Sequence, residues 1–189
     1  MKPAIRSAVL APAFAEQRAA LEHFIAERFH LVHGARVSHF CAHLIGMRDA
    51  DGAWLAAAGY TPAASRPLFL EQYLEAPVEE LLARASGRRV ERERIAEVGN
   101  LAAAAGMGRA LIPALGRYLH ELGYRWVVFT ATRQLRNAFR RLRLEPLHLA
   151  PALAARLPDG GAAWGKYYMH APSVMGGLIA ACLHERGPA

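Results

Sequence analysis

The stretch from Glu97 to Leu111 combines residue types that bind anions where a strand gives way to a helix. An apolar strand runs into a loop that contains Gly106 and Gly108, and a helix is expected from Arg109 to Leu122. Backbone amides freed at such a junction attract negative charge. The sequence therefore predicts a site for a phosphate-bearing ligand, with a tight turn needed only for packing as the alternative. A dinucleotide site is not expected, because Leu111 stands where the third glycine would be.

Helical and strand-like patterns along the chain predict the elements that position this junction. Asp49-Ala-Asp-Gly52 predicts a tight hairpin turn, and the elements around the junction form a βαβ unit, so a mixed sheet is expected. The expected elements are a helix at 15–29, strands at 37–48 and 53–60, a helical stretch at 68–85 split at Pro77, strands at 90–98, 124–132, 144–149 and 164–170, an arginine-rich helix around Asn137, and a terminal helix at 174–185.

Length and composition favour one compact intracellular domain. The 189 residues are 53% hydrophobic and 21% charged, which suits one substantial core better than two. Two cysteines are too few for a disulfide framework and no secretory leader is recognised, so a reduced, cytoplasmic protein is expected. The weakly charged run at 162–183 is interrupted by Lys166, His170 and Pro172, so it does not predict a membrane span.

The order of parts around this junction resembles the acyl-CoA-binding half of the GNAT acyltransferases. Gly106 and Gly108 fit the pattern of their helix start, and Asn137 follows the next strand on a short helix. Over nearly the whole chain the sequence resembles the thermostable hemolysin family, and its layout is also similar to the acyl-homoserine-lactone synthases. The segments that carry the resemblance are 67–74 with 78–79, 97–102, 129–132, 135–137, and 164–168 with Pro172 and Val174. The resemblance implies an α/β (α+β) fold over residues 1–189, a single domain with a GNAT-like mixed, mostly antiparallel central sheet flanked by helices.

The resemblance also implies roles for individual residues in acyl transfer from a thioester to an amine. Such an enzyme removes a proton from the nucleophile, stabilises the oxyanion and protonates the thiolate. Glu97 is the expected base, with capping or pairing to an arginine as the alternative. Asn100 stands where the synthases carry an arginine, and no tyrosine follows Asn137 in its helix, so Tyr167 or Tyr168 is the candidate acid. The expected set is Glu97, Asn100 and Tyr168 as catalytic residues, Leu101, Ala102, Ala103, Gly106, Met107, Gly108, Arg109, Ala110 and Asn137 at the donor, and Glu71, Tyr73 and Thr130 at the substrate.

The expected partners follow from the same resemblance and from charge. The donor is acyl-CoA or an acyl carrier protein, and the acceptor is a small amine, either a metabolite or an amino acid. The net charge of +7 comes from arginines at 88–94 and 133–143, which form either a solvated surface or an attraction for an anionic partner. Nucleic acid is not expected, because aromatic residues do not interleave with these arginines. No metal is expected, because His39, Cys41 and His43 have no recognisable further ligand.

Two functions of other classes remain alternatives at this point. The family's name and the basic surface suggest a membrane-active protein that lyses or contacts bilayers. The lack of a tyrosine after Asn137 suggests a GNAT-shaped module that holds an acyl thioester without catalysis. A homodimer that completes its sheet across residues 164–174 is also open.

Overall fold

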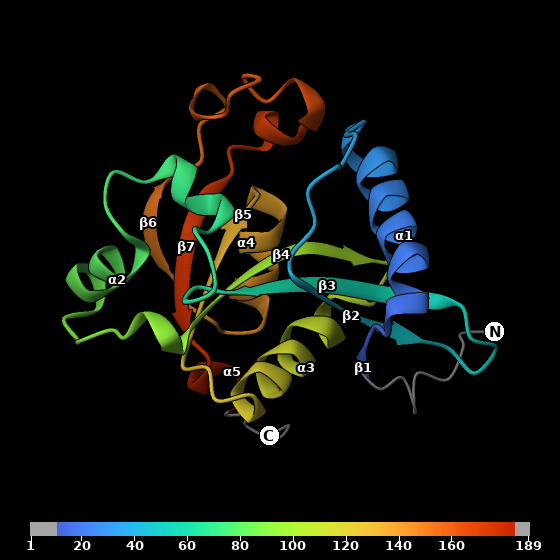
Figure 1. Cartoon of the computed structure of the whole chain (residues 1–189), viewed down its shortest axis with the longest axis horizontal. Coiled ribbons are helices and arrows are strands. Elements are labelled where there is room, and N and C mark those ends of the chain that lie inside the picture. Colours follow the sequence, from blue (N-terminus) through green and yellow to red (C-terminus); the bar gives the residue numbers. More distant parts are fainter. Residues whose placement is uncertain (1–10, 184–189) are drawn as a thin grey trace.

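One mixed sheet forms the centre of the molecule (Figure 1). The computed structural model describes residues 11–183, apart from the side chains of Ala11 and Arg109. Within this range seven strands pair in the order β1-β2-β3-β4-β5-β7-β6, and only β4 and β5 run parallel. The strands are β1 (Ala11–Pro12), β2 (His43–Arg48), β3 (Trp54–Pro62), β4 (Ile95–Ala103), β5 (Trp126–Ala131), β6 (Leu147–Pro151) and β7 (Ser173–Leu178). The mixed, mostly antiparallel sheet predicted from the sequence is confirmed.

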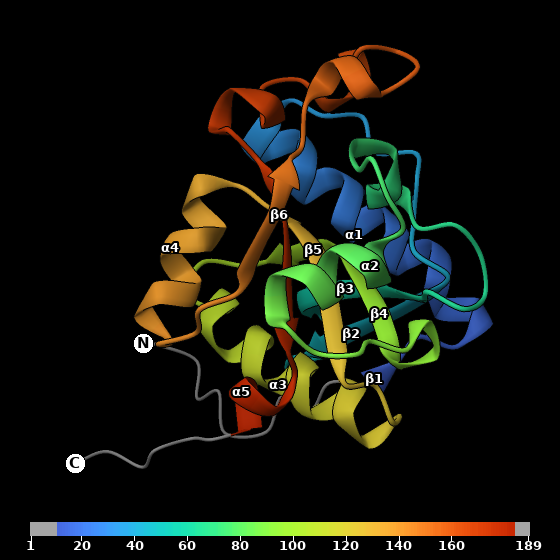
Figure 2. The same cartoon turned by 90° about the vertical axis from the view of Figure 1, so that its left-hand side faces the viewer.

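Helices cover both faces of this sheet (Figures 1 and 2). The helices are α1 (Ala15–His33), α2 (Val78–Ser86), α3 (Gly108–Glu121), α4 (Arg133–Arg141) and α5 (Ala180–Leu183), with short 3-10 helices η1 (Phe69–Tyr73), η2 (Arg92–Arg94), η3 (Ala154–Arg156), η4 (Ala162–Trp164) and η5 (Tyr167–His170). Leu44 packs in one cluster with α1, and the next residue, Ile45, packs in another with α3. Because successive side chains of a strand point to opposite faces, α1 and α3 lie on opposite sides of the sheet.

The β4–α3–β5 crossover matches the βαβ unit expected at the junction. The parallel ladder joins Ile95 with Trp126 and ends where Val98 faces Phe129. Beyond this point β4 continues to Ala103 along β3, while β5 continues along β7. The register with β3 shifts at the same place, and Asn100 has a φ of +52°, which is the geometry of a bulge. β4 and β5 therefore separate beyond Val98, and residues 99–103 have no ladder partner in β5.

The last third of the chain differs from its prediction. The predicted strand at 164–170 is instead the pair of 3-10 helices η4 and η5, and the strand β7 occupies the first part of the predicted helix at 174–185. Only Ala180–Leu183 is helical, and residues 184–185 lie outside the described range. Gly176 and Gly177 weaken the strand pattern of β7, but tertiary packing requires a small residue: a Cβ on Gly176 would lie 2.4 Å from the side chain of Leu82.

Other boundaries moved by several residues without changing the element type. The first hairpin strand begins at His43 rather than at residue 37, so His39 and Cys41 lie in an irregular segment rather than on a strand face. β4 begins at Ile95 and runs past Glu97, so Glu97 lies inside the strand rather than at its end. The first helix continues one turn beyond Phe29. This last extension adds side chains to the site described below.

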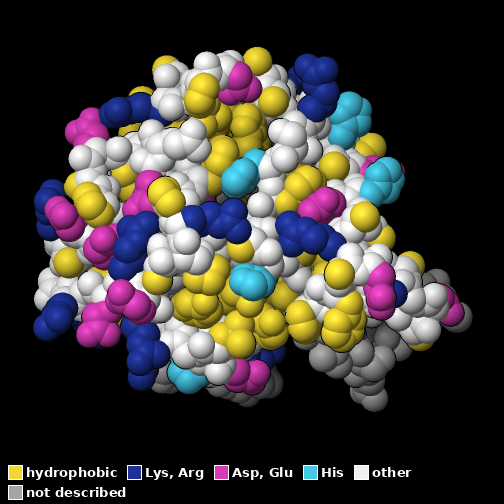
Figure 3. All heavy atoms as spheres, viewed as in Figure 1, with side chains coloured by type: hydrophobic (Ala, Val, Ile, Leu, Met, Phe, Trp, Pro, Cys, Tyr) yellow, Lys and Arg dark blue, Asp and Glu magenta, His cyan; other side chains and the backbone are white. Residues whose placement is uncertain are grey.

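The surface carries charges of both signs. On the face drawn in Figure 3, basic side chains lie scattered among hydrophobic and acidic ones. Among residues 11–183, no helix combines the length and the apolar character needed to cross a bilayer. Over the same residues, His, Cys, Asp and Glu side chains do not gather in groups of three or more that could hold a metal ion.

Candidate active site

A cavity of about 520 Å³ lies at the separation of β4 and β5. Glu97 is in its wall, together with the following β4 residues as far as Gly106 in the loop and Gly108 at the start of α3. Thr130 on β5 and several residues of α4 close the opposite wall, and α1 contributes a third side. The cavity thus joins the predicted base to the predicted anion loop. Most of the remaining lining is apolar, which suits a ligand with a hydrocarbon part.

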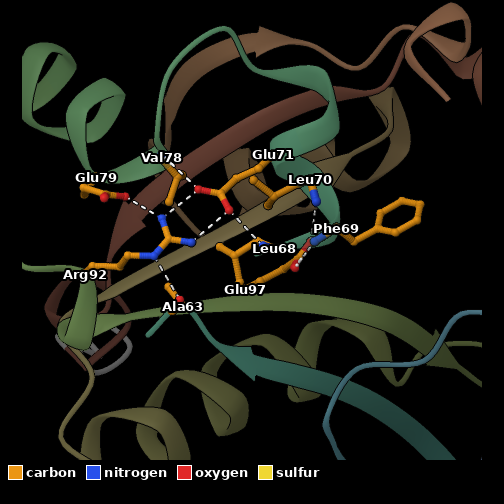
Figure 4. A network of polar contacts seen from close by, with 9 residues as sticks. All are labelled: Ala63, Leu68, Phe69, Leu70, Glu71, Val78, Glu79, Arg92 and Glu97. Atoms are coloured by element: carbon orange, nitrogen blue, oxygen red, sulfur yellow. Dashed lines mark hydrogen bonds and ion pairs between the residues drawn. The ribbon is translucent and has the colours of Figure 1, made fainter. Parts of the chain in front are cut away.

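Glu97 is a buried carboxylate that is held by two backbone amides (Figure 4). The Phe69 N–H donates to Oε2 at 2.8 Å, and the Leu70 N–H donates to Oε1 at 2.9 Å. Burial raises the pKa of the Glu97 carboxyl to about 7, although the two donated hydrogen bonds lower it in part. A carboxyl whose pKa is near neutrality can both accept and return a proton at physiological pH. In this geometry the Glu97 carboxylate can cap η1 and also act as a base.

Glu71 lies beside this carboxylate and belongs to an ion-pair network with Arg92 (Figure 4). Arg92 donates to both oxygens of Glu71 at 2.7 and 2.9 Å and to Glu79 at 2.6 Å. Burial acts to raise the pKa of Glu71, but the hydrogen bonds from Arg92, Leu68 and Val78 outweigh it, so the pKa is lowered. Glu71 is not among the described residues that line the cavity. Its contacts favour a structural role, which is to hold η1 and α2 against the strand that carries Glu97.

Replacing Arg92 with Met should lower the free energy of unfolding by about 2 kcal/mol, because it leaves two carboxylates without their partner. Arg84→Met is the matched control. The Arg84 side chain is 68% exposed against 25% for Arg92, so loss of its pair with Glu80 should cost less than about 0.5 kcal/mol. Urea unfolding at pH 7 measures both. Equal effects would contradict a structural role for the Arg92 network.

Aromatic side chains form the part of the cavity nearest to Glu97. Phe69 stacks on His39 with ring centroids 4.7 Å apart and also contacts Trp164. Tyr73 lines the cavity, and its hydroxyl lies 2.6 Å from the hydroxyl of Tyr168. Tyr168 itself is not among the described lining residues, whereas Tyr167 is. Burial raises the pKa of both Tyr73 and Tyr168, so both phenols stay protonated at neutral pH.

The predicted donor residues divide into two groups. Leu101, Ala102, Ala103, Gly106 and Gly108 line the cavity. Met107 is buried in a core cluster with Leu111, Ala110 is exposed, and the side chain of Arg109 lies outside the described part of the chain. The backbone of the loop, rather than the side chains of Met107 and Ala110, therefore faces the cavity.

Two predicted asparagines have contacts that differ from their expected roles. The Asn100 side chain accepts from the Cys41 N–H at 2.8 Å and donates to the His39 carbonyl at 3.1 Å. It fastens the segment that carries His39 to the bulge of β4. Asn137 is exposed on α4, where its Oδ1 accepts a 3.5 Å hydrogen bond from Arg140, and it is absent from the described lining.

Comparison with known proteins assigns the family. The sequence model described as thermostable hemolysin matches residues 12–183. The chain belongs to the thermostable hemolysin family. The resemblance inferred from the motifs is thereby confirmed. Among curated proteins, none matches its sequence.

Solved structures similar to this member of the thermostable hemolysin family include several acyltransferases. FeeM, an N-acyl amino acid synthase from uncultured soil microbes, has a TM-score of 0.61 and 14% identity, with 93% of this chain and 92% of that chain covered. The AHL synthase LasI has a TM-score of 0.62 and 14% identity over 92% and 90% of the two chains. The aminoglycoside acetyltransferase AAC(6')-Ib, solved with coenzyme A and kanamycin, has a TM-score of 0.56 and 13% identity over 96% and 100%. At these identities the similarity establishes the GNAT-like fold.

Sequence reasoning missed the contribution of α1 to the site of this thermostable hemolysin family member. Arg28, Phe29, Val32 and His33 all line the cavity. The predicted helix ends at Phe29, and its pattern indicates only the apolar residues that pack on the sheet. Ile25, Phe29 and His33 are four residues apart and share one helix face, so extension of the same periodicity by one turn would have identified this wall.

Proposed function

We propose that this protein is an N-acyltransferase that moves an acyl group from acyl-CoA or an acyl carrier protein to the amine of a small metabolite or amino acid, as one catalytic domain over residues 1–189. The observation that carries the proposal is the cavity that joins Glu97 to the Gly106 loop across separated strands. The donor's phosphates bind the loop amides, and its thioester lies along residues 101–103 of β4. The acceptor amine enters among the aromatic side chains.

The residues near Glu97 supply the proton transfers of such a reaction. The amine nitrogen attacks the thioester carbonyl, and Glu97 accepts its proton directly or through water. Backbone N–H groups of residues 101–103 stabilise the oxyanion. The C–S bond then breaks, and the thiolate takes a proton from Tyr73, whose hydroxyl is hydrogen bonded to Tyr168. The proton that Glu97 accepted returns to the Tyr73 oxygen through water, which restores both groups. The products are an amide and a free thiol. Tyr168 thus acts through Tyr73, and Asn100 acts by positioning the segment with His39.

The apolar part of the cavity supports a donor with an acyl chain longer than acetyl. This apolar part, called the acyl arm below, is lined by three residues of α3 and two residues that follow β7. They are Leu115, Gly116, Leu119, Ile179 and Cys182. A Cβ on Gly116 would lie 2.7 Å from Cβ of Cys182, so these two residues narrow this arm of the cavity. Each methylene buried there contributes about 0.8 kcal/mol, which is about a fourfold gain in affinity.

Calorimetric titration with coenzyme A and with acetyl-, hexanoyl- and decanoyl-CoA tests the donor site. We expect affinity to rise with chain length until the arm is filled. Cys182→Phe should abolish this rise and leave acetyl-CoA binding unchanged. Ala181→Phe, at the exposed neighbouring position outside the described lining, is the matched control and should keep the wild-type profile. Tight binding that is independent of chain length would refute the acyl arm.

Release of free thiol from acyl-CoA, followed with a panel of amines and amino acids, tests the reaction itself. We expect thiol release that requires both donor and amine, with the amide identified by mass spectrometry. Donor binding without thiol release for any amine would instead support a non-catalytic binding module. A donor that reacts only when it is loaded on an acyl carrier protein would identify the carrier as the substrate.

A further inference from the structure

Arg28 has donors that the protein itself does not satisfy. It lies on α1 and lines the cavity, and its Nη2 donates to the carbonyl of Ala103 at 3.1 Å. Its Nε is buried and has no hydrogen-bond partner. Its side chain makes no further hydrogen bond and no ion pair with a carboxylate among the described residues. Arg28 as a whole is half-buried, but a guanidinium N–H that is itself buried without an acceptor is costly to maintain, so a ligand is its expected partner.

The surroundings of Arg28 favour an anion. Of the described side chains that line the cavity, it is the only lysine or arginine, and Glu97 is the only acid. Ala103 is the last residue of β4, directly before the Ala104-Ala105-Gly106 loop, and these three loop residues also line the cavity. Arg28 therefore adds a full positive charge beside backbone amides that already favour negative groups. A planar guanidinium binds phosphate or carboxylate oxygens through paired hydrogen bonds.

We propose that Arg28 is a substrate-binding residue that receives an anionic group of a ligand in this cavity. The inference rests on the proposed function and deepens it, because it requires one of the two substrates to carry an anion close to the end of β4. That anion is either a phosphate of the donor or a carboxylate of the acceptor. Both present the same oxygen chemistry to the guanidinium, and truncated substrates separate them.

The experiment compares the wild type with Arg28→Met, Arg28→Lys and the control Arg84→Met, which removes the same charge from an exposed position on α2. Thermal unfolding without ligand should be nearly the same for all four proteins, because Arg28 contributes a single hydrogen bond to the fold. Coenzyme A and inorganic pyrophosphate, which report a phosphate site, are titrated calorimetrically. Turnover is then measured with an acyl-N-acetylcysteamine thioester, which has no phosphate, against amino acids and their amides.

A phosphate role predicts that Arg28→Met weakens binding of coenzyme A and pyrophosphate about 10- to 100-fold and leaves turnover of the truncated thioester unchanged. A carboxylate role predicts the reverse: coenzyme A binds normally, and KM rises by a similar factor for amino acids but not for their amides. Arg28→Lys should recover only part of either loss, because lysine keeps the charge without the paired donors.

Arg28→Met that behaves like Arg84→Met in every assay would overturn the proposal. The proposed function fails separately, when the wild type binds no thioester and releases no thiol. In that case Arg28-dependent binding of pyrophosphate would still support the anion site, and its absence would refute both.

Discussion

Glu97→Gln is expected to lower kcat by about 10²- to 10⁴-fold while leaving acyl-CoA affinity close to that of the wild type. Loss of a positioned general base has an effect of this size. Glutamine keeps the shape and an oxygen acceptor for one of the two backbone amides of Phe69 and Leu70, while the other amide faces an NH2 group. The melting temperature of the variant checks that η1 stays in position. Single-turnover thiol release measures the chemical step, and calorimetry measures donor binding.

The pH profile provides an independent check on the role of Glu97. The pKa of its carboxyl is about 7, so wild-type kcat should rise with pH through neutrality as the base loses its proton, and Glu97→Gln should lack this limb. The same raised pKa has the opposite effect on the free energy of unfolding, which decreases as pH rises. Because the folded-state pKa is raised above 4.5, the stability that this proton contributes is fully present below about pH 4.5 and is lost as pH rises through about 7.

Glu75→Gln is the matched control for this variant. The Glu75 side chain is 83% exposed and pairs with Arg156, so it has no contact with the cavity wall described above. We expect wild-type kcat and an unchanged pH profile. A Glu97→Gln protein with normal turnover would remove the base from the mechanism and leave this carboxylate as a cap for η1.

Gly108→Trp should weaken coenzyme A binding about 100-fold without unfolding the protein. Gly108 begins α3 and lines the cavity, and a Cβ at this position would have no heavy atom within 4 Å. A small side chain is therefore accommodated, whereas an indole occupies space that the donor needs. Gly108→Ala, the matched control, should bind coenzyme A nearly as well as the wild type.

Calorimetry with coenzyme A, together with the melting temperature of each variant, separates a lost site from a lost fold. If Gly108→Trp retained wild-type affinity at an unchanged melting temperature, the loop that begins α3 would not be the phosphate site. A large fall in the melting temperature of Gly108→Ala would instead indicate that this glycine is needed for packing.

The central part of the fold could be predicted from the sequence because its signals are local. The Asp49–Gly52 turn connects β2 and β3, and the glycine loop precedes a periodic helix and an apolar strand. The C-terminal part could not be predicted in this way. β7 contains two adjacent glycines, of which Gly176 is required by close contact with Leu82 of α2, far away in the sequence. The strand conformation of β7 also depends on partners on both sides.

The candidate site likewise contains residues that a local motif predicts and residues that it does not. Glu97, Gly106 and Gly108 lie on the junction and were recognised from the motif around them. The family resemblance implies that Glu71 is at the substrate, but its carboxylate pairs with Arg92, 21 residues further along. Arg28 carried no local signal, since an arginine on an amphipathic helix is ordinarily a solvated residue. Only the tertiary arrangement distinguishes it.

The order β5-β7-β6 has a consequence for how the protein is made. β6 pairs only with β7 among the described strands, and one edge of β5 is also covered by β7. Of the described strands, β7 is synthesised after β5 and β6, so β6 has no partner and β5 keeps an open edge until residues 173–178 have left the ribosome. An open strand edge invites pairing with other chains. The nascent chain therefore depends on β7 for protection from aggregation, and a message truncated before residue 173 would yield a sheet with that edge exposed.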